Sequence, residues 1–251
     1  VCVHGLTRNG RDFEEVAAAA SAAGWRVICP DVVGRGESDA LADPAGYSFP
    51  QYLQDMNALI ARLDVEQVDW LGTSMGGLIG MLMAAQPKSP LRRLVLNDIG
   101  PFLPRPAIAD IASQVAEERF WPDFASASQE LRQAYDGFGP LDDEQWQHLI
   151  ERSLTQTADG RWRRNYDPAL GNAFATSVGG DVDLWSFWEA VRQPVLVLRG
   201  EHSQLLTPAT AAEMKQRGPC AEVVEIAGSG HAPALMRREQ IELILDWLGR
   251  P

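Results

Sequence analysis

Residues 68–85, VDWLGTSMGGLIGMLMAA, place a serine between a strand-like run and a helix-like run, and this arrangement decides the fold. The segment Gly72-Thr73-Ser74-Met75-Gly76 matches the G-x-S-x-G nucleophile elbow, in which small residues let the chain turn sharply around the serine. The apolar residues before it are typical of a strand, and those after it indicate a helix that ends before Pro87. The stretch therefore predicts an exposed, nucleophilic hydroxyl on Ser74 at the end of a strand.

On both sides of this elbow, short strand-like runs alternate with helix-length segments. The further runs that are apolar enough to form strands are residues 1–3, 25–29, 93–96, 194–198 and 221–226. Helices are expected over residues 12–23, 48–63 and 240–248. Ser48 and Gln51 indicate a capping box at the start of the second helix. Thr207-Pro208 indicates the start of another helix. This alternation predicts an α/β fold with a mainly parallel sheet and helices on both faces.

The alternation stops in one long segment, residues 101–193, which is polar, helix-like and aromatic. Residues 101–194 hold 13 of the 20 aromatic residues of the chain. Aromatic side chains bury large apolar areas, so we expect this segment to pack onto the rest of the molecule and to line a pocket there. The sequence thus predicts a core of residues 1–100 and 194–251, with residues 101–193 inserted as a helical cap.

The composition argues against several classes of protein. The 251 residues include 34 Asp and Glu against 22 Lys and Arg, and a net charge of −12 does not suit a nucleic-acid partner. No apolar run approaches the roughly 20 residues of a membrane span, so we expect no membrane segment. Cys2, Cys29 and Cys220 form neither a disulfide framework nor a zinc-binding pattern, which favours the reducing cytoplasm and predicts no metal.

A serine hydroxyl is a poor nucleophile until a base removes its proton. The best candidate for this base is His231, in the segment Gly228-Ser229-Gly230-His231 between the last strand and the last helix. The other histidines are His4, His148 and His202, which are less suitably placed. His4 is expected to brace its own loop through a hydrogen bond.

Two backbone amides are expected to stabilise an oxyanion beside Ser74. The amide of Met75 lies at the N-terminus of the helix that follows the serine. A second donor is expected from Leu6, directly after the first strand.

Taken together, these segments resemble the α/β-hydrolase superfamily. The resemblance includes His4-Gly5, the Gly-rich turn of residues 31–38, the elbow at Ser74 and the Gly-x-Gly-His of His231, and it extends over nearly the whole chain. It implies that residues 101–193 are the cap that varies among members, inserted between the sixth and seventh strands. It also implies that two strands precede Val1.

The resemblance leaves the position of the acidic partner of His231 open. Most members carry it after the seventh strand, where this chain has Ser203 instead. In a smaller branch of esterases the acid follows the sixth strand in an Asp-Ile-x-Pro turn, which is similar to Asp98-Ile99-Gly100-Pro101 here. We therefore expect Asp98 to be the acid with Ser203 as an auxiliary group near the imidazole, and Glu201 remains the alternative acid.

The sequence predicts a serine hydrolase acting on a small or medium ester-like substrate, with a carboxylesterase or thioesterase preferred and no metal or organic cofactor. A lactonase, or a C–C bond hydrolase of aromatic degradation, is the alternative reaction. A ligand-binding receptor on the same scaffold is the alternative of another class. The residues considered for substrate contact are Arg8, Asn9, Trp185 and Trp188. The sequence contains no signal for an oligomeric state.

Overall fold

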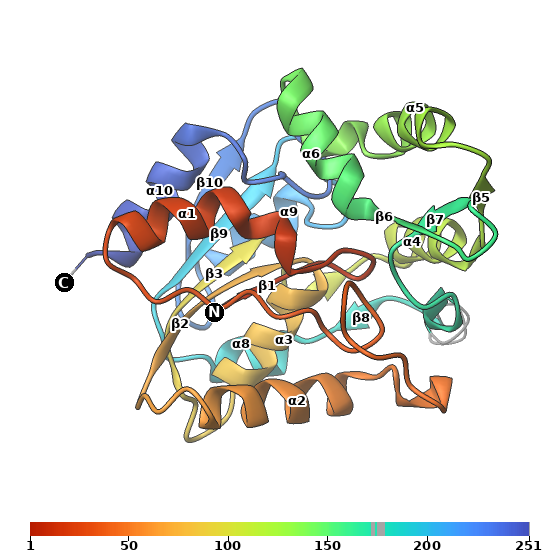
Figure 1. The fold of residues 1–251 in the computed structure, drawn as a ribbon. Helices are drawn as coiled ribbons and strands as arrows, with labels where there is room; N and C mark the ends of the chain where they lie inside the picture. The colour runs from red at the N-terminus through yellow and green to blue at the C-terminus, as the bar shows by residue number, and fades with distance from the viewer. Residues whose placement is uncertain (172–173, 175–178, 251) are drawn as a thin grey trace.

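A five-stranded parallel sheet forms the centre of the molecule (Figure 1). The structure is a computed structural model that describes residues 1–171, 174 and 179–250. Its strands, in spatial order, are β1 (Cys2–Val3), β2 (Val68–Thr73), β3 (Leu91–Asn97), β9 (Val195–Gly200) and β10 (Glu222–Ile226). All four pairings are parallel. The predicted α/β fold with a mainly parallel sheet is confirmed.

The two faces of the sheet are covered by different helices because successive side chains of a strand point to opposite sides. Leu94 and Leu96 pack into a cluster with α2 (Phe49–Ala61), α3 (Met75–Ala84) and α8 (Trp185–Ala190). Val95, between them, packs on the other face.

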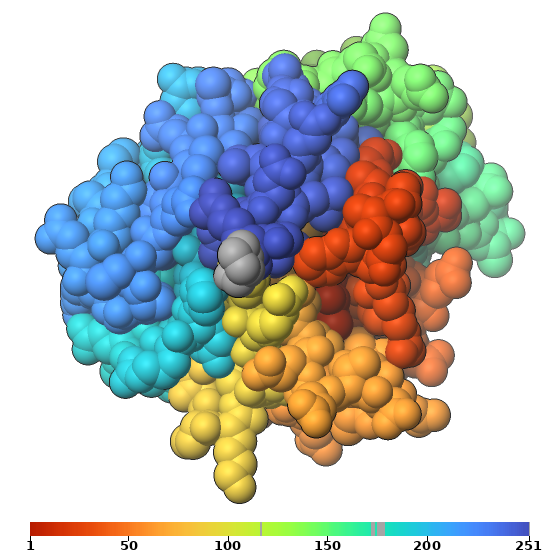
Figure 2. Space-filling view, turned by 90° about the vertical axis from the view of Figure 1, so that its left-hand side faces the viewer, coloured from red at the N-terminus to blue at the C-terminus, as the bar shows by residue number. Residues whose placement is uncertain are grey.

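The helices on that second face are α1 (Glu14–Ala22) and α10 (Arg238–Leu248). These two helices contact each other, and Figure 2 shows the red N-terminal part of the chain beside the blue C-terminal part. Helix α9 (Pro208–Met214) follows β9 and begins with the expected cap, since the Thr207 side chain accepts from the Thr210 amide.

The inserted segment is mainly helical, but it also contains short strands that the sequence did not indicate. Its helices are α4 (Arg105–Ala116), α5 (Phe124–Ala134), α6 (Asp143–Ser153) and the already described α8. Its strands are β4 (Phe102–Leu103), β5 (Phe120–Trp121), β6 (Leu154–Gln156), β7 (Trp162–Arg164) and β8 (Val182–Asp183), paired antiparallel as β4–β8 and β5–β7–β6. Strands of two or three residues are too short to show a period-2 pattern, which is why the sequence indicated helices alone in this segment.

Part of this segment has an apolar core of its own. Trp121, Leu131 and Ile150 lie in a cluster that contains no residue of the central sheet. Most of the segment lies on one side of the sheet, with α4, α5 and β5 to the right in Figure 1.

Two other local predictions were wrong. Residues 25–29 run beside β1, where the Cys2 amide donates to the Ile28 carbonyl (2.8 Å), but they lack the ladder of bonds that defines a strand. Ser48 does sit at the N-terminal cap of α2, yet its side chain makes no capping bond, and Gln51 bonds Asp55 instead.

The parallel sheet brings distant loops together, because all of its strands end at the same edge. Residues 4–6 follow β1, Ser74 follows β2, Asp98 follows β3, and residues 201–203 follow β9. His231 lies in the loop after β10. In the described ranges, no helix is long and apolar enough to cross a membrane.

A close approach between α3 and β1 gives a test of this packing. A Cβ atom on Gly76 would lie 2.0 Å from the Val3 carbonyl oxygen, so Gly76→Ala must push the helix away from the strand. We expect the free energy of unfolding to fall by about 3 kcal/mol. Urea denaturation measures it, and Gly179→Ala, where a Cβ would meet no atom within 4 Å, is the matched control. Equal stability of both variants would contradict the close approach.

Candidate active site

Ser74 occupies a strained turn between β2 and α3. Its backbone has φ 51° and ψ −114°, in the region that non-glycine residues rarely adopt. The turn is tight enough that a Cβ on Gly72 would lie 2.3 Å from the Gly76 carbonyl oxygen. The Ser74 amide donates to the Asn97 carbonyl (3.0 Å), which fixes the turn against the next strand. The hydroxyl is therefore held at the N-terminus of α3.

The structure joins Ser74, His231 and Asp98 in one chain of hydrogen bonds. The Ser74 Oγ lies 2.9 Å from His231 Nε2, and His231 Nδ1 lies 2.7 Å from Asp98 Oδ2. The Asp98 side chain is fully buried, whereas that of His231 is 21% exposed. An imidazole that donates from Nδ1 to the carboxylate presents Nε2 as an acceptor to the serine hydroxyl.

The Asp98 carboxylate is held by further donors. Its Oδ1 accepts from the Gly200 amide (2.8 Å), and its Oδ2 accepts from the Ser203 hydroxyl (2.6 Å). The Ser203 Oγ in turn accepts from the Leu206 amide (3.1 Å), which fixes its orientation. Ser203 was expected near the imidazole, and in the structure its hydroxyl bonds the carboxylate of Asp98 instead.

The structure places the alternative acid, Glu201, away from His231. Its Oε2 accepts from the Gly228 amide (2.8 Å) and lies 3.8 Å from Nε2 of His202. The His202 side chain is 66% exposed. His148 lies on α6 beside Glu14 (3.3 Å).

The two expected oxyanion donors are backbone amides without a partner in the described residues. Neither the Leu6 amide nor the Met75 amide takes part in a hydrogen bond there. Leu6 lines the cavity next to Ser74, and Met75 is the first residue of α3. The buried Arg35 supports both residues, since its guanidinium donates to the Leu6 carbonyl (2.9 Å) and contacts Met75 Sδ (3.5 Å).

His4 braces the loop that carries Leu6. It is fully buried; its Nδ1 donates to the Gly5 carbonyl (2.7 Å), and its Nε2 accepts from the Val32 amide (2.9 Å). These two contacts require the neutral imidazole. Burial and the positive charge of Arg35 together lower the pKa of His4 to about 4, although the hydrogen bond to Gly5 acts in the opposite direction.

Asn97 is a structural partner of the site that sequence reasoning missed. It is fully buried, and its side-chain amide donates to Thr73 Oγ1 (3.0 Å) and to the Pro233 carbonyl (2.8 Å). It thereby links the residue before Ser74 to the loop that carries His231. No sequence motif contains Asn97, although its position directly before Asp98 at the end of β3 could have indicated a role beside the site.

A cavity of about 300 Å³ opens beside Ser74 and His231. Its walls include Ala107 and Ile111 of α4 together with Tyr135 and Phe138, whose rings stack at 4.9 Å. The expectation that aromatic residues of the inserted segment line a pocket therefore holds for these two, which the sequence did not single out.

Of the four residues considered for substrate contact, only Arg8 lines this cavity. Asn9 is buried; its amide donates to the Arg152 carbonyl (2.8 Å) and its oxygen caps a short helical turn. Trp188 is buried in the core and bonds the Arg217 carbonyl (2.9 Å), and Trp185 stacks with the Arg217 guanidinium. These three residues do not line the cavity, because their side chains are engaged in hydrogen bonds or in packing elsewhere.

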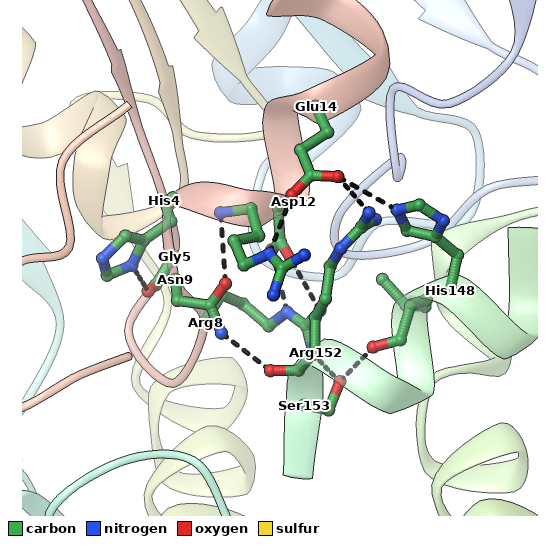
Figure 3. A network of polar contacts seen from close by, with 12 residues as sticks. His4, Gly5, Arg8, Asn9, Asp12, Glu14, His148, Arg152 and Ser153 are labelled. Atoms are coloured by element: carbon green, nitrogen blue, oxygen red, sulfur yellow. Dashed lines mark hydrogen bonds and ion pairs between the residues drawn. The ribbon is translucent and has the colours of Figure 1, made fainter. Parts of the chain in front are cut away.

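A polar network ties the loop after β1 to α6 of the inserted segment (Figure 3). Arg8 pairs with Asp12 through two bonds (2.8 and 2.6 Å) and also donates to Ser153. Arg152 and His148 both contact Glu14. This network holds Arg8, which lines the cavity, in place against α6.

Comparison with known proteins agrees with this fold. The family model of the alpha/beta hydrolase fold matches residues 1–235. The chain belongs to the alpha/beta hydrolase fold family. It is similar to the 3-hydroxybutyrate-oligomer hydrolase of Cupriavidus necator, at 46% identity over 97% of this chain and 85% of that protein.

Two solved structures are also similar to this hydrolase. A protein of Rickettsia typhi assigned to the hydrolases has a TM-score of 0.92 and 36% identity, covering 98% of this chain and 84% of its own. An alpha/beta hydrolase of Novosphingobium aromaticivorans has a TM-score of 0.90 and 38% identity, and the match covers 100% of this chain and 88% of that chain. The family resemblance is confirmed, and the chain is an ester-hydrolysing enzyme.

The low pKa of His4 predicts a pH-dependent loss of stability. Below pH 6.5 the unfolded chain protonates this histidine, whereas the folded chain leaves it neutral down to about pH 4. Stability is therefore complete above pH 6.5 and decreases as the pH falls through this window, by about 2 kcal/mol between pH 6.5 and pH 5. Urea denaturation at pH 7 and pH 5 measures it.

His4→Gln removes the titrating group, so its unfolding free energy should change less between the two pH values than that of the wild type. His202→Asn, at an exposed position, is the control and should behave as the wild type does. The same pH dependence in His4→Gln and the wild type would contradict the assignment.

Proposed function

We propose that this hydrolase cleaves esters through an acyl-enzyme on Ser74, with His231 as general base and Asp98 as the acid that orients it. The observation that carries the proposal is the chain of hydrogen bonds from the Ser74 hydroxyl through the imidazole to the buried carboxylate. Each contact lies in the range that proton transfer requires.

The geometry supports a two-step reaction. Ser74 Oγ attacks the ester carbonyl carbon while its proton moves to His231 Nε2, and the imidazolium then protonates the departing alcohol oxygen. Water attacks the acyl-enzyme in the second step, again giving its proton to His231, and Ser74 regains its hydroxyl with release of the acid. Asp98 stabilises the imidazolium in both steps. The free amides of Leu6 and Met75 are the proposed donors to the oxyanion.

We further propose that the substrates are short linear oligoesters of a hydroxy acid, such as 3-hydroxybutyrate. The name of the Cupriavidus necator relative, at 46% identity over nearly the whole chain, supports this class. The cavity of about 300 Å³ is of a size that suits a small molecule. Its polar end at Ser74 and its apolar walls on α4 suit an ester with short aliphatic segments.

Loss of the nucleophile separates an enzyme from a receptor built on the same scaffold. We expect Ser74→Ala to lower kcat for the 3-hydroxybutyrate dimer by at least about 10⁴-fold, because no acyl-enzyme can form. The wild type should show a burst of nitrophenol with 4-nitrophenyl acetate and should react with a fluorophosphonate, and the variant should do neither. A wild type without burst or labelling would make the receptor the better explanation.

The identity of the acid is tested by a pair of variants. Asp98→Asn should lower kcat by about 10⁴-fold, since the amide favours the wrong imidazole tautomer. Glu201→Gln, the matched control, should retain activity within about twofold because Glu201 does not touch His231. Steady-state kinetics on the dimer measures both, and the reverse pattern would assign the role to Glu201.

A further inference from the structure

Two arginines, Arg8 and Arg164, line the cavity beside Ser74, and among the described residues only Arg8 forms an ion pair. Arg8 donates from Nε and Nη2 to the two oxygens of Asp12 and from Nη1 to Ser153, so each of its nitrogens has a partner. Its charge is balanced by a nearly buried carboxylate. Arg8 therefore has little capacity left to bind an anion.

Arg164 is the second arginine, and it lies at the end of β7 in the inserted segment. Its Nη1 donates to the Gln114 carbonyl (2.7 Å) and to the Tyr166 hydroxyl (3.3 Å), both uncharged acceptors. Its Nε is buried without a hydrogen-bond partner. Within the described ranges of the chain, Arg164 forms no ion pair and its Nη2 forms no hydrogen bond.

Among the described residues, the acidic groups near Arg164 are either paired with other arginines or exposed to solvent, and Glu118 is one of the exposed groups. Arg119 holds Glu117 (3.1 Å), and Arg161 holds Asp159 (2.8 Å). Asp110 also lines the cavity, but it is exposed to solvent and thus well hydrated. A partly buried, anchored guanidinium whose Nη2 has no partner among the described residues therefore lines the same cavity as Ser74.

We propose that Arg164 is a carboxylate subsite that binds the free acid end of the substrate while an ester bond of the same molecule lies at Ser74. This inference rests on the proposed function. Every linear oligomer of a hydroxy acid has one carboxylate, which is costly to bury unless it is paired. The Arg164 side chain supplies a permanent positive charge, and its Nη2 can donate a charge-assisted hydrogen bond to a carboxylate oxygen.

The arrangement explains how one cavity accepts both parts of such a molecule. Helix α4 contributes an apolar part of the cavity wall through Ala107, Ile111 and Val115. This wall suits the methyl and methylene groups of the substrate. The fixed positions of Ser74 and Arg164 make the enzyme selective for short esters that carry a carboxylate over neutral esters.

Substitution of Arg164 tests this selectivity. We expect Arg164→Gln to lower kcat/KM for the 3-hydroxybutyrate dimer by about 10- to 100-fold, mainly by raising KM, because a charge-assisted hydrogen bond is lost. The decrease for the neutral 4-nitrophenyl butyrate should be much smaller. Arg164→Lys should recover part of the dimer activity. Equal decreases for both esters, or no decrease for the dimer, would overturn the subsite.

Arg163→Gln is the matched control. Arg163 is the neighbour of Arg164 on β7, donates to the Tyr166 carbonyl (2.9 Å) and does not line the cavity at Ser74. This variant should leave the ratio of the two kcat/KM values unchanged. A change as large as that of Arg164→Gln would show that β7, and not the Arg164 charge, sets the selectivity.

Binding without turnover separates this inference from the proposed function. Calorimetric titration of the 3-hydroxybutyrate dimer into Ser74→Ala should give a Kd that the added Arg164→Gln change raises by about 10-fold or more. That result supports the subsite even if the wild type does not cleave the dimer, in which case only the proposed substrate fails. An unchanged Kd, or no dimer binding by an enzyme that cleaves neutral esters, overturns the subsite.

Discussion

The burial of the Asp98 carboxylate is the constraint on which the rest of the site depends. A charged group without solvent contact persists only when donors surround it, and here the Gly200 amide, the Ser203 hydroxyl and the His231 imidazole all point to it. These donors come from the ends of two other strands. The carboxylate therefore holds the loops after β9 and β10 against the end of β3, and the position of His231 over Ser74 follows from it.

The loop after β1 is fixed by different means. The neutral imidazole of His4 donates to the Gly5 carbonyl, and the guanidinium of Arg35 donates to the Leu6 carbonyl. The Leu6 amide has no partner among the described residues. Arg8, two residues later, connects this loop to α6 through Ser153. The geometry of the cavity thus depends on polar contacts between the core and the inserted segment as well as on apolar packing.

Much of this could be predicted because its signals are local. The turn at Ser74, the position of His231 before the last helix and the strands at the centre of the sheet all appear as short patterns of small, polar and apolar residues. The strand expected at residues 25–29 and the capping box at Ser48 were wrong, since pairing and side-chain orientation depend on neighbours that the local sequence does not specify. Asn97, Tyr135 and Phe138 were missed for the same reason: no motif contains them.

The sequence by itself determined the class of fold, the family and the sharp turn that carries Ser74. Only the tertiary structure decided which carboxylate meets the imidazole, because Asp98 and Glu201 follow adjacent parallel strands and each was close enough to be considered. The direction in which each side chain points at the strand end distinguishes them, and Asp98 points inward to the donors while Glu201 points to the Gly228 amide. The role proposed for Arg164 likewise depends on the tertiary structure, because only the fold decides which acceptors its guanidinium meets.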